Sequence, residues 1–119
     1  MYGGDSGFAE KRQFADLESL LTMKMKPGDK PVFADGYGYQ GQPILVTEFG
    51  GVKNEPVDPE RFAQKIAQVT QAIQESPLIQ GYCYTQLTDI ENERNGLLTY
   101  GREPKIPLEI IRAINQGMK

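Results

Sequence analysis

The stretch PILVTEFGG at residues 43–51 decides the fold class of this chain. Its branched apolar residues follow one another without alternation, which predicts a strand buried on both faces, as in a parallel sheet covered by helices. The apolar run ends at Glu48, and two glycines then allow a sharp turn. Because α/β barrels and open α/β sheets keep their reactive groups at the carboxyl ends of such strands, Glu48 is the leading candidate for a catalytic residue. The alternative is a glutamate that pairs with a lysine or caps the next helix.

A helix and a second strand follow this glutamate. The sequence DPE at residues 58–60 supplies a capping aspartate, a proline suited to the first helical turn and an acid at the positive end of the helix dipole. Apolar residues then recur at helical spacing, so we predict a helix that runs to about Glu75. The segment LIQGYCYTQL at residues 78–87 is typical of a strand. A strand–helix–strand unit of this length requires parallel strands, so both strands are expected to end on the same side.

Two more helices are predicted nearer the ends of the chain. The first runs from Glu10 to about Met25, where an amphipathic pattern gives way to PGD at residues 27–29. The second begins near Pro107. The glycine-rich residues 1–9 are expected to be loosely held.

Two loops remain as candidates for binding. The tyrosines of GYGYQG at residues 36–41 are either part of an irregular surface turn or stacking platforms for a ligand. The polar residues 88–105 follow the second strand, where such folds place binding groups. The alternating acids from Asp89 to Glu93 match a calcium loop poorly, because the glycine comes too late, so we expect no metal site.

Composition excludes several classes of function. The chain has 119 residues, a net charge of −3 and no basic face, so nucleic-acid binding is not expected. It has no apolar run near the roughly 20 residues of a membrane span and no signal-peptide pattern, so we expect a soluble protein without a membrane partner. Histidine is absent, which excludes imidazole chemistry within the chain, and no cofactor is implied. The lone Cys83 is expected to be a small buried apolar residue.

Four motifs together resemble one known family. QPILVTEFG at 42–50, GYCYTQLTD at 81–89, NGLLTY at 95–100 and REPK at 102–105 are similar to the final two βα units of the catalytic barrel in glycoside hydrolase family 2, the β-galactosidase and β-glucuronidase family. The resemblance covers roughly residues 40 to 115. It implies an α/β fold in which the single domain 1–119 is part of a (β/α)8 TIM barrel, with strands seven and eight, their helices and a preceding helix. A complete barrel takes roughly 250 residues.

The resemblance implies that Glu48 is the nucleophile of a retaining enzyme that acts on β-glycosides. The acid/base of that family lies in an Asn-Glu pair after strand four, and no segment of this chain is matched to strand four. Asp89 and Glu91 could reach the site by position, but the family offers no precedent for either as the acid. The chain is therefore expected to be a C-terminal fragment that is inactive alone and that associates with the rest of its barrel or with another copy.

Substrate contacts are expected from Tyr84, Thr85, Asp89 and Tyr37. Thr85 stands where the family often has a tryptophan, so sugar stacking there would fall to Tyr84 or to parts outside the chain. The Asn-x-Lys that β-glucuronidases use for a uronate reads ERN at residues 93–95, which favours a β-galactoside or another neutral β-glycoside.

Two rival interpretations remain open. One is a non-catalytic carbohydrate-binding or assembly module in which Glu48 is a hydrogen-bonding residue. The other is an accidental fragment that folds without an independent role.

Overall fold

The computed structural model describes residues 16–22, 24–25, 30–50 and 58–117. The expectation for residues 1–9 lies outside these ranges. Seven elements are described: α1 Leu17–Thr22, β1 Lys24–Met25, β2 Lys30–Pro31, β3 Ile44–Phe49, α2 Pro59–Gln74, β4 Ile79–Tyr84 and α3 Leu108–Asn115. No helix within the described ranges is long and apolar enough to cross a bilayer.

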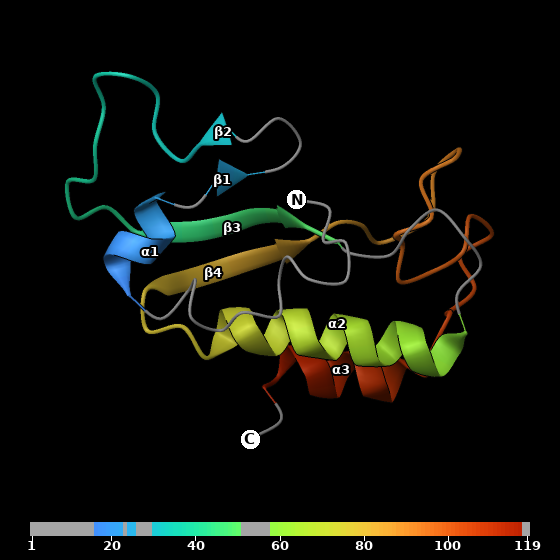
Figure 1. The fold of residues 1–119 in the computed structure, drawn as a ribbon. Helices are drawn as coiled ribbons and strands as arrows, with labels where there is room; N and C mark the ends of the chain where they lie inside the picture. The colour runs from blue at the N-terminus through green and yellow to red at the C-terminus, as the bar shows by residue number, and fades with distance from the viewer. Residues whose placement is uncertain (1–15, 23, 26–29, 51–57, 118–119) are drawn as a thin grey trace.

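β3 and β4 form a parallel pair, which confirms the predicted pairing (Figure 1). The register joins Ile44 to Ile79 at one end and Phe49 to Tyr84 at the other, with irregularities between. α2 connects the two strands and packs against β4 and α3. Since the strands are parallel, Glu48 and the residues after Tyr84 lie at the same end of the sheet.

The core lies on one face of this small sheet. One apolar cluster joins Phe62 and Ile66 of α2 to Ile114 of α3, and a second joins Leu20 and Ala72 to partly buried strand residues. Figure 1 shows α2 and α3 on the same side of the two strands. The helices therefore fix which side of the sheet is covered.

The other face of the sheet is exposed among the described residues. Leu45 is 56% exposed, and Thr47 and Cys83 are exposed as well. The predictions of a β3 buried on both faces and of a buried Cys83 are thus wrong for this chain. The reason is that the described helices pack on only one side of the strands.

The first predicted helix is wrong at its C-terminal end. α1 ends at Thr22, and Lys24–Met25 pairs antiparallel with Lys30–Pro31. Its N-terminal end has a cap that was not predicted: the Ser19 N–H donates to Asp16 Oδ1 at 2.8 Å. The part of the prediction before residue 16 lies outside the described residues.

The start of α2 is as the sequence predicts. Asp58 is the N-cap, and its Oδ2 accepts a hydrogen bond from Arg61 N at 3.1 Å. Pro59 occupies the first helical position, where a backbone N–H would have no partner within the helix. The helix ends at Gln74 with Glu75 as C-cap, close to the predicted end.

Replacing Asp58 by alanine is expected to destabilise the protein by about 1 kcal/mol, because one donor of the first helical turn loses its partner. The free energy of unfolding from urea titration measures the change. Asp58→Ser keeps a capping oxygen and should retain most of the stability, so an equal loss in both variants would contradict the capping role.

Candidate functional site

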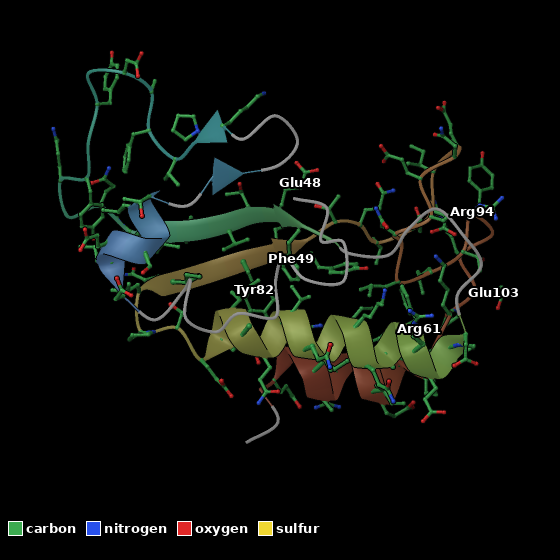
Figure 2. The ribbon with its side chains drawn as sticks, viewed as in Figure 1. Glu48, Phe49, Arg61, Tyr82, Arg94 and Glu103 are labelled. Atoms are coloured by element: carbon green, nitrogen blue, oxygen red, sulfur yellow. The ribbon has the colours of Figure 1, made fainter. Side chains whose placement is uncertain are left out.

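Glu48 lies at the C-terminal end of β3 and is exposed. Figure 2 shows its side chain on the side of the strand away from α2 and α3. Within the described part of the chain, Glu48 makes no hydrogen bond or ion pair. The interpretation of Glu48 as a helix cap is excluded, since Asp58 caps α2. The carboxylate is thus accessible to a ligand at the end of the sheet where α/β proteins bind substrates.

The two strand ends approach closely beside this glutamate. The Thr85 N–H donates to Phe49 O at 2.7 Å, which extends the pairing one residue past β4. Gly50 is buried, and a Cβ at this position would collide with Thr85 O. The glycine after Phe49 is therefore needed for close backbone approach. This contact places Thr85 next to the strand end that carries Glu48.

Tyr84 belongs to the covered face of the sheet. It packs against the cluster of Phe62 and Ile66, and its ring meets Phe49 edge-on with centroids 5.4 Å apart. Its hydroxyl donates to Asn95 O at 2.7 Å. Burial, and then the charge of Asp89, raise the pKa of the phenol above its ordinary value, so Tyr84 stays a donor. In this structure the side chain is a packing residue that holds the following loop.

Asp89 holds that loop together through an ion pair and a hydrogen bond. Its Oδ1 accepts from Lys105 Nζ at 2.6 Å and from Gly96 N at 2.9 Å. Lys105 Nζ also donates to Arg94 O at 2.9 Å and lies 5.3 Å from the centre of the Phe62 ring. Both side chains of the ion pair are mostly buried, at 15% exposure for Asp89 and 21% for Lys105. These contacts tie the loop to α2.

Replacing Asp89 by alanine is expected to lower the free energy of unfolding by about 2 kcal/mol, since two hydrogen bonds, one of them to a charged group, are lost. Asp35→Ala is a matched control at an exposed position, with an expected change within about 0.5 kcal/mol. Denaturant titration compares the two variants. Equal stability of both variants would show that the contacts of Asp89 contribute nothing to the free energy of unfolding.

Tyr37 lies at the opposite end of β3 from Glu48. It is 78% exposed, in the segment that leads from β2 into the N-terminal end of β3 (Figure 1). The structure therefore brings Thr85 near the strand end of Glu48, gives Tyr84 and Asp89 internal partners, and places Tyr37 away from this end.

Tyr100 was not predicted from the sequence as a binding residue, although it is as exposed as Tyr37, at 78%. It lies in the loop from β4 to α3, and this loop extends beyond the C-terminal ends of both strands (Figure 1). Leu87 and Ile90 of the same loop are 67% and 50% exposed. The aromatic side chain in a loop after a strand was a signal that could have identified it.

No group of three or more histidine, cysteine, aspartate or glutamate side chains within the described ranges is arranged to hold a metal ion. No protein-family model matches the chain, and no curated protein shows significant similarity to it.

Proposed function

We propose that this chain is the C-terminal part of a TIM barrel in a retaining β-glycoside hydrolase of the family 2 type, with Glu48 as its nucleophile. The observation that carries the proposal is an exposed carboxylate, unpaired among the described residues, at the C-terminal end of one of two parallel strands. The four sequence motifs that resemble family 2 support the same assignment.

The proposed reaction has two steps at one carbon atom. The Glu48 carboxylate attacks the anomeric carbon while a second carboxyl, about 5–5.5 Å away, protonates the departing oxygen. The resulting glycosyl ester is hydrolysed by water that the second carboxyl deprotonates. Two successive inversions retain the configuration of the sugar. An exposed nucleophile suits this role because the sugar must approach it directly.

The second carboxyl is proposed to come from a segment that precedes this chain in the barrel. Asp89 is engaged with Lys105, and Glu91 lies in a tight turn closed by hydrogen bonds between Ile90 and Glu93. The described sheet has two strands, so each has one edge without a strand neighbour. Further strands of the barrel would pair with those edges and cover Leu45, as parallel sheets require. The chain alone is accordingly proposed to be inactive.

Trapping the glycosyl ester tests this proposal. A 2-deoxy-2-fluoro-β-galactoside with a dinitrophenolate leaving group should react with the polypeptide that joins this chain to the rest of its barrel. The fluorine slows both steps and the leaving group speeds the first, so the ester accumulates. Peptide mass spectrometry is expected to find the sugar on Glu48, and Glu48→Gln should stay unlabelled. Stoichiometric labelling of another carboxylate would refute the assignment.

A further inference from the structure

The loop between β4 and α3 presents an exposed aromatic ring on a hydrogen-bonded support. Tyr100 is 78% exposed, although residues on either side of it are fixed by hydrogen bonds. Thr99 N donates to Glu103 O at 2.8 Å, and Arg102 N donates to Thr99 O at 2.9 Å. The Thr99 hydroxyl also accepts from Glu103 N at 3.1 Å. An exposed aromatic ring on a fixed turn loses little conformational freedom when it binds a ligand.

A continuous set of backbone hydrogen bonds links this turn to the strand of Glu48. Thr85 N donates to Phe49 O at the end of β3, as described above. The segment before Tyr100 is then bonded to the segment that follows Thr85: Leu97 N to Gln86 O at 3.0 Å and Leu98 N to Leu87 O at 2.9 Å. The turn of Tyr100 is therefore held at a defined position relative to the C-terminal end of the sheet.

The position of this loop indicates which part of a substrate it would meet. Glu48 lies at the end of β3, whereas the loop continues past the ends of both strands (Figure 1). The sugar attacked by Glu48 must lie with its anomeric carbon against that carboxylate. Groups that extend outward from this carbon are the leaving group and whatever it carries. An aromatic side chain farther out is suited to the leaving group.

We propose that Tyr100 is a stacking platform for a pyranose ring on the leaving-group side of the β-glycoside. This inference rests on the function proposed for Glu48. A pyranose presents a face of C–H groups, and aromatic rings bind such apolar faces through burial and dispersion. The chemical class of the natural substrate is then a β-linked disaccharide or longer saccharide.

The absence of tryptophan from the chain provides a direct test. Tyr100→Trp introduces the only indole, whose emission reports contact with a sugar. Lactose is the probe with a leaving-group ring, and methyl β-galactoside is the probe without one. Lactose is expected to shift the emission of Trp in this variant to shorter wavelength in a saturable manner, and methyl β-galactoside is expected to leave it unchanged.

Tyr37→Trp is the matched control, since Tyr37 is equally exposed at 78% but lies before the opposite end of β3. Its emission should respond to neither sugar. No response of Tyr100→Trp to lactose, or an equal response of both variants, would overturn the proposal. Far-ultraviolet circular dichroism of each variant verifies that the fold is kept.

The polypeptide that joins this chain to the rest of its barrel allows a second measurement, of its activity. Tyr100→Ala should raise KM for lactose by about three- to tenfold and leave kcat/KM for methyl β-galactoside unchanged. Equal effects on both substrates would contradict a leaving-group platform. If Glu48 fails to be labelled by the fluorosugar while Tyr100→Trp responds to lactose, the proposed nucleophile is refuted and Tyr100 remains a sugar contact without a leaving-group role. If Glu48 is labelled while Tyr100→Trp does not respond to lactose, only the proposal for Tyr100 is refuted.

Discussion

Replacing Glu48 by glutamine is expected to lower kcat/KM of the joined polypeptide by roughly 10⁴- to 10⁶-fold, the range seen when a hydrolase loses a member of its nucleophilic apparatus. The amide is nearly the same size as the carboxylate, so binding of the sugar should survive while ester formation stops. Hydrolysis of a nitrophenyl β-galactoside measures the loss. Glu109→Gln removes an equally charged exposed group from α3 and should leave turnover unchanged.

Chemical rescue separates a nucleophile from a residue that only binds sugar. In Glu48→Ala, azide can occupy the space of the carboxylate and attack the same face of the anomeric carbon. Only one inversion then occurs, so the expected product is the α-glycosyl azide, identified by nuclear magnetic resonance. Formation of the β-azide would show that another carboxylate is the nucleophile, and full activity of Glu48→Gln would show that Glu48 has no catalytic role.

Replacing Gly96 by alanine is expected to destabilise the protein by about 3 kcal/mol, the upper range for forced overpacking. A Cβ at this position would collide with Asp89 N and Thr88 C and would lie 2.6 Å from Leu98 O. All three atoms belong to the backbone, so no side chain can rotate to make room. A backbone shift that makes room for the Cβ would break the hydrogen bond from Gly96 N to Asp89 and would disturb the ion pair between Asp89 and Lys105.

Gly101 offers a matched control in the same loop. The heavy atom nearest to a methyl group added at Gly101 would be Thr99 Oγ1 at 3.8 Å, an ordinary van der Waals distance. Gly101→Ala should therefore change the free energy of unfolding by no more than about 0.5 kcal/mol. Denaturant titration of the two variants tests the contrast, and similar stabilities would show that the close approach at Gly96 is not required.

Local sequence patterns predicted the central strand–helix–strand unit well. The cap and proline at the start of α2 act within one helical turn, so no distant contact is needed to recognise them. The length of the connection then required the parallel pairing of β3 and β4. Glu48 could be placed at the strand end for the same reason.

Features that depend on contacts between separate segments were predicted poorly. The pattern of the first helix continued through Met25, but Lys24–Met25 pairs with Lys30–Pro31 instead, and such pairing overrides local propensity. The apolar run of β3 also suggested burial on both faces, whereas Leu45 is exposed because the described helices cover one side. A sequence pattern shows that a face can be buried and leaves open what covers it.

For the candidate binding residues too, the residue type was predicted from local sequence, whereas the partners depend on contacts between segments. Tyr84 and Asp89 were selected for their place after a strand, but their partners Asn95 and Lys105 lie 11 and 16 residues further along the chain. Tyr37 and Tyr100 are equally exposed, and only the topology of the sheet separates the end that carries Glu48 from the other. The chemistry of these side chains could be predicted from the sequence, but the direction in which each side chain points could not.

The exposed thiol of Cys83 has a practical consequence for handling the protein. Two chains can be oxidised through these side chains to a cross-linked pair, since nothing in the described structure buries the sulfur. A non-reducing gel of material kept in air should show a band at twice the chain mass that dithiothreitol removes and Cys83→Ser prevents. Measurements of subunit assembly will therefore report the native equilibrium only in reducing buffer or with the serine variant.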